Sequence, residues 1–209
     1  MPNPYLAELE PAEIQDYRSA QVLTGATIGY PSWNLLYYCL YCSIPIKEYV
    51  RTPGMSVLEE DIVVVETGTN RGVSTIVMAQ ALRDLGLSAK VKTVEYKDYP
   101  QSLARANVEA AGLSDQVEFH LGDGVEFLRG LDSAINFLFI DDNHHFNHVM
   151  AEVEAAYPKL KPGAMVYFDN TMRGGVAEVL AAIKDRYGAN IVEFPNCSMG
   201  PPGNALWQL

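Results

Sequence analysis

The sequence has few basic residues, and this shortage narrows what the protein can bind. Only 15 Lys and Arg stand against 26 Asp and Glu, which gives a formal net charge of -11. So acidic a chain repels phosphate backbones unless a local basic patch compensates, and the sequence has no such patch. DNA and RNA are therefore not expected as partners, whereas a small-molecule substrate is.

Cysteines are also scarce. Cys39, Cys42 and Cys197 are an odd number in a sequence without an export signal, so a disulfide framework is not indicated. Cys39 and Cys42 form a C-x-x-C pair, but no second ligand pair or adjacent basic residue accompanies it. Core packing is therefore preferred to a redox or zinc role.

The sequence lacks a long apolar run and a secretory leader. The longest apolar stretch, Leu35 to Ile46, is interrupted by Ser43 and Pro45 and is too short to span a bilayer. The first residues, MPNPY, do not combine a basic region with an apolar core. We therefore expect a cytoplasmic protein without a membrane segment.

From residue 61 onward, buried-strand patterns alternate with helical ones, which is typical of a parallel sheet covered by helices on both faces. Strands are expected at 62–66, 90–95, 116–121, 135–140 and 165–168, and helices at 73–85, 100–111, 125–131, around 149–157, and at 176–187. Lys161, Pro162 and Gly163 are expected to form the turn before the fifth strand.

Two closing strands, 191–194 and 205–209, are separated by a loop rich in Pro and Gly, so they should pair antiparallel. The sequence thus predicts an α/β fold with a seven-stranded, mostly parallel sheet and an antiparallel C-terminal hairpin. Residues 61–209 would form this domain, and residues 1–60 a helical cap that lines the substrate site, within one compact unit.

The cap is expected to hold helices over 12–22 and 31–50, and the second of these carries an aromatic stripe. Its members, Tyr30, Trp33, Tyr37 and Tyr41, recur at helical spacing. Core packing is the preferred interpretation. The alternative is that the stripe walls a pocket for a flat organic substrate, which would favour an aromatic acceptor.

An acidic glycine turn, Glu66-Thr67-Gly68-Thr69-Asn70-Arg71-Gly72, joins the first strand to the first long helix. Ligands of open α/β sheets bind at such turns, outside the carboxyl ends of the strands. Only Gly68 and Gly72 are present, so the dinucleotide pattern is not met. The Glu66 carboxylate would repel a pyrophosphate but attract a cationic amino-acid head group. A purely structural turn is the alternative.

Two further acids follow the second and third strands. Glu95 is positioned to accept hydrogen bonds from both hydroxyls of a ribose, or it is a solvated strand end. Asp123 is positioned to accept a hydrogen bond from an adenine amine, to cap the following helix, or to do both.

The fourth strand ends at Asp141 and the fifth at Asp169-Asn170. Because neighbouring parallel strands end at the same rim, three oxygen ligands are expected to meet there. Such ligands suit magnesium better than zinc or a soft metal. The alternative is that Asp169 and Asn170 merely cap the next helix.

In this order the motifs resemble those of class I S-adenosylmethionine-dependent methyltransferases, with a Rossmann-like fold. Over about residues 60–209 the chain is most similar to the metal-dependent small-molecule O-methyltransferases, which include catechol and caffeoyl-coenzyme A O-methyltransferases. The resemblance implies a pocket for S-adenosyl-L-methionine and a magnesium site. The pocket would be lined by Glu66, Gly68, Gly72, Ser74, Glu95, Tyr96, Asp123 and Asp141, and the cation would be held by Asp141, Asp169 and Asn170. Homodimers are frequent in this family.

The catechol and caffeoyl-type enzymes place a Lys three residues after the first metal Asp, where this chain has His144. Related natural-product O-methyltransferases, some acting on sugar hydroxyls, have His there. Imidazole titrates near neutrality and suits general-base work. His144 is therefore the expected base, with Asp141 beside it, and His145 is its rival. His148 is expected to be a surface or supporting residue.

These features together predict metal-assisted O-methylation of a small catechol-like or vicinal-diol substrate, with the aromatic and sugar classes both open. One alternative is metal-free transfer to nitrogen or carbon, in which Asp141 binds only the amino group of the cofactor. Another is a protein that binds S-adenosylmethionine without methylating, because a fold does not dictate its chemistry.

Overall fold

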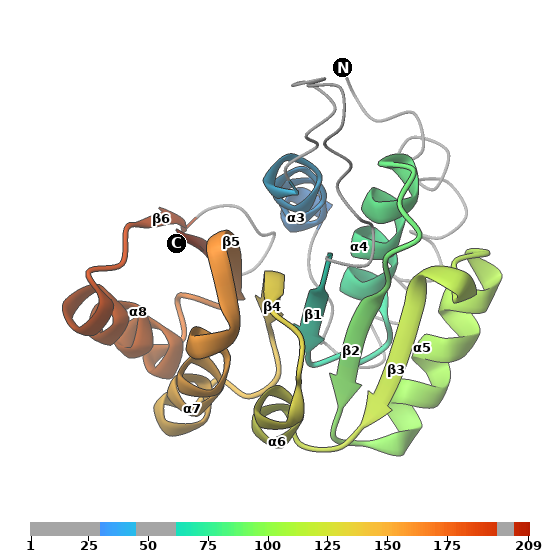
Figure 1. The fold of residues 1–209 in the computed structure, drawn as a ribbon. Helices are drawn as coiled ribbons and strands as arrows, with labels where there is room; N and C mark the ends of the chain where they lie inside the picture. Colours follow the sequence, from blue (N-terminus) through green and yellow to red (C-terminus); the bar gives the residue numbers. More distant parts are fainter. Residues whose placement is uncertain (1–29, 45–61, 196–202) are drawn as a thin grey trace, which may run out of the picture.

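A computed structural model describes residues 30–44, 62–195 and 203–209, and the strands in these ranges form one seven-stranded sheet. The strand order is β3-β2-β1-β4-β5-β7-β6 (Figure 1). The strands are β1 (Val64–Thr67), β2 (Val91–Glu95), β3 (Val117–Leu121), β4 (Ile135–Ile140), β5 (Leu160–Asp169), β6 (Ile191–Phe194) and β7 (Asn204–Gln208).

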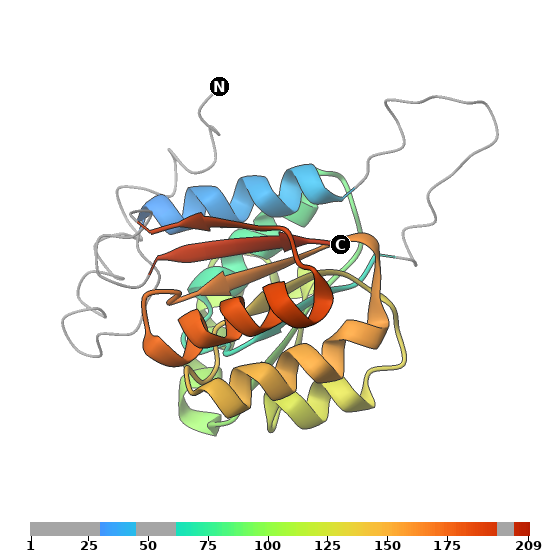
Figure 2. The same ribbon diagram turned by 90° about the vertical axis from the view of Figure 1, so that its left-hand side faces the viewer.

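The sheet is parallel from β3 to β5, whereas β7 runs antiparallel to both β5 and β6. Figure 2 shows the two C-terminal strands beside β5 at the edge of the sheet. The predicted mostly parallel sheet with an antiparallel C-terminal hairpin is therefore confirmed.

Helices cover both faces of this sheet (Figure 1). One face carries α3 (Tyr30–Ser43), α4 (Val73–Asp84) and α5 (Asp98–Ala110); the other carries α6 (Gly124–Gly130), α7 (Phe146–Ala156) and α8 (Gly174–Tyr187); short 3₁₀ turns lie at Ser114–Gln116 and Tyr157–Lys159. Successive strand residues enter opposite layers: Val64 lies in the core under α4, and Val65 in the core under α6 to α8. This two-sided burial explains why residues 62–65 and strand β4 are almost entirely apolar.

Two predicted boundaries differ from the structure. Lys161, Pro162 and Gly163 lie inside β5 instead of in a turn before it. Pairing with β4 passes from Leu160 directly to Met165, so these residues form an irregular bulge, where Gly163 has a φ of +81°. Proline is tolerated there because a bulge interrupts the ladder of backbone hydrogen bonds. The helix predicted over 31–50 ends at Ser43, and residues 45–50 and the predicted helix over 12–22 lie outside the described residues.

The aromatic stripe of α3 faces the core. Tyr37 is buried and its hydroxyl donates to Asp84 Oδ2 of α4 at 2.6 Å, while Trp33 and Tyr41 are partly buried against the same core. The core-packing interpretation is therefore confirmed for these three residues; the side chain of Tyr30 lies outside the described set. Cys39 also packs partly against this core, but Cys42 is exposed, so core packing is wrong for Cys42.

The order of the sheet reverses direction between β1 and β4, because the chain fills β1, β2 and β3 outward and then returns to the other side of β1. In doubly wound sheets the ligand crevice opens at the carboxyl ends of the strands at this point. The turn after β1 and the residues after β4 therefore lie where a ligand is expected. Among the helices of the described ranges, none is long and apolar enough to cross a bilayer.

Candidate active site

The turn between β1 and α4 is held against both neighbouring strands. The backbone amides of Gly68 and Thr69 donate to the Val94 carbonyl of β2 at 2.9 and 3.2 Å. Gly68 has a φ of +90°, and a Cβ there would collide with the backbone carbonyl of Asp141. Glycine is therefore required at position 68, both by its dihedral angle and by the close approach of the residues after β4.

Gly72 closes the same turn. It is the N-cap of α4 with a φ of +84°, and a Cβ there would lie 3.0 Å from the Cβ of Ala104 in α5. Both predicted glycines thus bring the backbone of the turn close to its surroundings, which is the geometry that a ligand-binding turn needs.

Glu66 lies beneath this turn and is completely buried. Its carboxylate accepts hydrogen bonds from the hydroxyls of Ser74, Thr75 and Thr93, the last two at 2.5 Å. Burial raises the pKa of Glu66 to about 7, against the lowering effect of the three hydroxyls. Ser74, predicted to line the cofactor pocket, therefore directs its hydroxyl to Glu66.

The acids after β2 and β3 also have partners in their own chain. The Glu95 carboxylate accepts the backbone amides of Asn70 at 2.9 Å and Lys97 at 3.0 Å, and Tyr96 beside it is 67% exposed. Asp123 is the N-cap of α6, where its Oδ1 accepts the Glu126 amide at 3.0 Å. The capping role of Asp123 is confirmed, and its predicted contact with adenine stays a prediction.

The three predicted metal ligands lie together at the ends of β4 and β5. The Asn170 Nδ2 group donates to Asp141 Oδ1 at 3.1 Å and to Asp169 Oδ2 at 2.9 Å, so one amide bridges the two carboxylates. Burial and the neighbouring carboxylate raise the pKa of Asp141 well above its ordinary range, and burial raises the pKa of Asp169 to about 6. Asp169 is buried and Asp141 is partly buried, and a cation bound between two such carboxyl groups would stabilise their ionised forms.

The turn that carries Asn170 is not a helix cap. Asn170 has a φ of +58°, a conformation that Asn tolerates better than most residues, and α8 begins only after its N-cap, Arg173. The alternative that Asp169 and Asn170 merely cap α8 is therefore wrong.

His144 reaches the same cluster. Its Nε2 atom lies 3.8 Å from Asp141 Oδ1, and burial together with the positive charge of Arg173 lowers its pKa below the ordinary value of 6.5. A Cβ at Gly175 would collide with the backbone carbonyl of His144, so this glycine lets α8 pack against the loop. His145, the rival base, is exposed and is the N-cap of α7.

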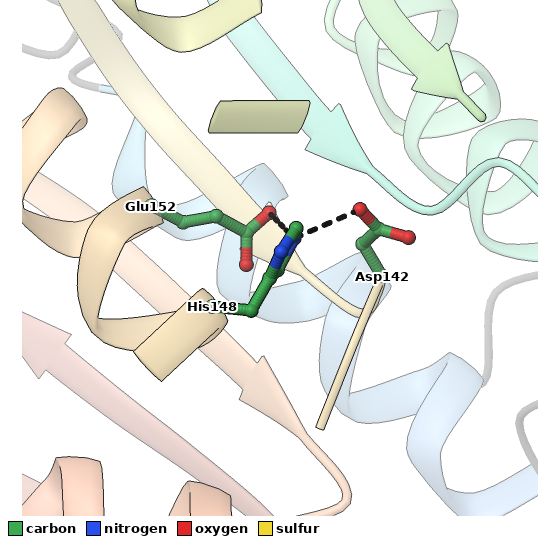
Figure 3. Close-up of side chains that lie close together, drawn as sticks. All are labelled: Asp142, His148 and Glu152. Atoms are coloured by element: carbon green, nitrogen blue, oxygen red, sulfur yellow. Dashed lines mark hydrogen bonds and ion pairs between the residues drawn. The ribbon is translucent and has the colours of Figure 1, made fainter. Parts of the chain in front are cut away.

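A second group of ionisable side chains, which the sequence did not predict, lies beside this site. Asp142, His148 and Glu152 lie close together, as Figure 3 shows, although His148 was expected only as a surface or supporting residue. The spacing of His148 and Glu152, four residues apart on one helix, was the available signal.

The chain is similar in sequence to several known proteins. A family model described as a methyltransferase domain matches residues 65–171. A catechol O-methyltransferase of Mycobacterium tuberculosis is 34% identical over 113 residues, which are 54% of this chain and 49% of that protein. A rhamnosyl O-methyltransferase of Mycobacterium bovis is 28% identical over 146 residues, 64% of this chain and 56% of that protein. The chain spans about half the length of the curated relatives it matches.

Solved structures show the same fold. The O-methyltransferase TomG from Streptomyces achromogenes, in complex with SAM, has a TM-score of 0.73 at 21% identity, covering 98% of this chain and 94% of that one. An O-methyltransferase from Bacillus cereus, in complex with SAH, has a TM-score of 0.70 at 20% identity, covering 99% and 96%. At these identities the likeness establishes the architecture of the sheet and its helices.

Proposed function

The chain belongs to the methyltransferase-domain family and has the class I methyltransferase fold, and we propose that it transfers a methyl group from S-adenosylmethionine to a hydroxyl of a small molecule. In this proposal a divalent cation, magnesium in the first instance, is held by Asp141, Asp169 and Asn170. Residues 61–209 act as the methyltransferase domain and residues 1–60 as its cap.

One observation carries the proposal: two carboxyl groups from neighbouring strands share a single amide beside an imidazole. Asp169 is 6% exposed, yet it lies close enough to Asp141 for both to bond Asn170. The donor set consists of oxygens, since the Asn170 amide can turn its Oδ1 atom inward, and hard divalent cations prefer such a set. The residues therefore fit the cation that the family resemblance implies.

The side chains have separate roles in this proposal. When bound, the cation would lower the pKa of an acceptor hydroxyl and S-adenosylmethionine would supply the methyl group. His144, with its lowered pKa, is largely neutral at pH 7 and is ready to take the hydroxyl proton at Nε2. Asp141 Oδ1 accepts the Asn170 amide and lies 3.8 Å from His144 Nε2, so in this proposal it lies beside the base and helps to hold the cation.

The cofactor would lie over the turn between Gly68 and Gly72, with Glu95 at its ribose. Both Glu95 oxygens already accept a backbone amide, but each carboxylate oxygen has a second lone pair for a ribose hydroxyl. The exposed Tyr96 ring next to Glu95 is available to cover the adenosine. Asp123 has one oxygen on the Glu126 amide and keeps the other for the adenine amine.

The acceptor is proposed to carry adjacent oxygens, as a catechol or a vicinal diol of a sugar does. The two relatives above are named for catechol and for rhamnosyl acceptors, and they support both classes equally. The aromatic stripe no longer favours an aromatic acceptor, because Tyr37 lies in the core. A homodimeric state, a cytoplasmic location and the lack of nucleic-acid partners stay predictions.

The test is a mass-spectrometric screen of catechols, phenolic acids and rhamnosylated compounds for one added methyl group. We expect activity to vanish in excess chelator, to return with magnesium, and to fall about 100-fold or more in Asp169→Ala, since a bound cation contributes several kcal/mol. Asp185→Ala, at an exposed acid of α8, is the matched control and should retain activity.

Two outcomes would contradict parts of the proposal. Full activity in chelator would favour metal-free transfer. Cofactor binding in calorimetry without turnover on any acceptor would favour a protein that binds S-adenosylmethionine without methylating.

A further inference from the structure

The second group of ionisable side chains comes from two adjacent segments. Asp142 follows the proposed magnesium ligand Asp141, and His148 and Glu152 lie one turn apart on the same side of α7. Figure 3 shows all three side chains directed toward one another. His148 Nε2 lies 3.1 Å from Asp142 Oδ2 and 4.0 Å from Glu152 Oε1.

Glu152 is the least expected member of this cluster. It is completely buried, and neither of its carboxylate oxygens accepts a hydrogen bond of standard geometry from the described part of the chain. The buried Thr67 hydroxyl at the end of β1 faces this carboxyl group and lowers its pKa by hydrogen bonding, whereas burial raises the pKa well above its ordinary range. A buried polar group without such a bond costs about 1–3 kcal/mol, and a charged one costs more. Glu152 therefore has at most one hydroxyl donor for a fully buried carboxyl group with two oxygens, and a bound cation would supply the charge that its ionised form lacks.

Gly124 packs closely against this cluster. A Cβ at this position would lie 3.0 Å from Glu152 Oε1, 3.2 Å from Asp142 Oδ2 and 3.3 Å from Thr67 Cβ. Side chains of β1, the loop after β4 and α7 thus meet beside the first residue of α6. A side chain at 124 would press against both carboxylates.

We propose that Asp142, His148 and Glu152 hold a divalent transition-metal ion, with zinc as the type, at a site separate from the proposed magnesium ligands. The three ligand atoms all lie within 4.8 Å of one another. Tetrahedral zinc with bonds near 2.1 Å separates its ligands by about 3.4 Å, and the two measured distances of 3.1 and 4.0 Å bracket this value.

The chemistry of the donors separates the two sites. The imidazole of His148 suits zinc, cobalt or nickel, whereas the all-oxygen set of Asp141, Asp169 and Asn170 suits magnesium. Three protein ligands would leave a fourth position of zinc open for water. The ion would also join the first turns of α7 to the loop that carries Asp141 and His144.

The experiment measures metal binding alone, without cofactor or acceptor, so its result is independent of the proposed function. The full-length chain is stripped with chelator and titrated with zinc by calorimetry and with cobalt(II) by visible absorption. To remove the first site, the same titrations are done in Asp169→Ala. We expect one zinc to bind in that background and to raise the Tm, because a metal that binds only the folded state stabilises it.

His148→Ala and Glu152→Gln in the Asp169→Ala background should weaken zinc binding at least about tenfold, and His148→Ala should also change the cobalt spectrum, because it removes the nitrogen ligand. His120→Ala is the matched control, because His120 is a partly exposed imidazole of β3 paired with Glu118. Where the buried Glu152 variant does not fold, Asp142→Asn in the half-exposed loop replaces it.

Two results would overturn the proposal. One is no zinc binding in the Asp169→Ala background at concentrations up to about 100 µM, which would mean that any zinc bound by the wild-type chain depends on the first site. The other is an unchanged affinity in His148→Ala together with Asp142→Asn.

Discussion

The parallel strands end at one edge of the sheet, which we call the carboxyl rim. The acidic side chains in its two halves have different hydrogen-bond partners. At β1 and β2, Glu66 accepts hydrogen bonds from three hydroxyls, and Glu95 accepts hydrogen bonds from two backbone amides. At β4 and β5, Asp141 and Asp169 share the side-chain amide of Asn170, Asp169 also accepts a hydrogen bond from the Asn170 backbone, and the positive charge of Arg173 lowers the pKa of both. The first half supplies several hydrogen-bond donors to each acid, whereas in the second half burial and the neighbouring carboxylate raise the pKa of Asp141 despite these partners.

This difference indicates how each half works. An acid with donors from its own chain is fixed in position before any ligand arrives, so it can recognise a ligand through its remaining lone pairs. Carboxyl groups that face each other with few donors raise one another's pKa, and they become stable as anions when a cation binds between them. We therefore expect the first half to recognise the cofactor and the second half to depend on added charge.

The largest predicted effect is a loss of activity when His144, which lies at the second half of the rim, is replaced. His144→Ala should lower kcat about 100-fold or more, because a positioned general base contributes about 10²–10⁴-fold. The affinity for S-adenosylmethionine should stay within about twofold, since the contacts of Glu66 and Glu95 are untouched. Initial rates and calorimetry on the same preparation measure the two quantities.

His145→Ala is the control, because His145 is exposed at the N-cap of α7. A loss of kcat in His145→Ala with full activity in His144→Ala would exchange the two roles. A loss of cofactor affinity in His144→Ala would contradict the division of the rim into two halves.

In the first half of the rim, the stability of the folded protein is expected to depend on pH through Glu66. The pKa of Glu66 is raised from 4.5 to about 7, so the folded protein keeps a proton that the unfolded chain has lost. The contribution of Glu66 is therefore fully present below pH 4.5 and is lost as the pH rises to about 7. The slope is at most about 1.4 kcal/mol per pH unit.

Urea unfolding at several pH values tests this expectation. Glu66→Gln should become more stable relative to wild type as the pH rises from 4.5 to 7, because the amide has no charge to bury. Glu109→Gln, at an exposed acid of α5, should run parallel to wild type. Parallel curves for Glu66→Gln and wild type would mean that the three hydroxyls keep Glu66 ionised throughout.

The sequence was sufficient to predict features that depend on local patterns. Strand and helix positions follow from apolar periodicity, and the role of Gly68 follows from the turn between a strand and a helix. The meeting of Asp141 with Asp169 was also predictable, because adjacent parallel strands end at one rim. These inferences need only the order of the strands.

Features that depend on three-dimensional packing were not predictable. Ser74 could have faced a ligand or the core, and only the position of Thr93 on the next strand shows that both hydroxyls bond Glu66. The pairing of Asp142 with His148 depends on the path of the loop after β4. Pro162 lies within β5, although proline is usually excluded from strands because it has no amide hydrogen to donate. The bulge at that point interrupts the ladder of backbone hydrogen bonds, so no donor is needed there.

The smallest predicted effect is a loss of cofactor affinity when Glu95 is replaced. This variant tests whether the first half of the rim recognises the cofactor. Glu95→Gln keeps the length of the side chain but replaces one oxygen by an amide donor, which faces the backbone amide of Asn70 or Lys97 instead of accepting from it. The Kd for S-adenosylhomocysteine, measured by calorimetry, should rise about tenfold, which corresponds to one lost charged hydrogen bond, while kcat at saturating cofactor should change little.

Glu109→Gln again serves as the control. If the affinity is unchanged and only the Tm falls, Glu95 is a structural acceptor for the two turns beside it, and the cofactor must be recognised mainly by the glycine turn and Asp123. A parallel loss in kcat would instead place Glu95 in the chemical step, and the rim would then act as one site with no division between its halves.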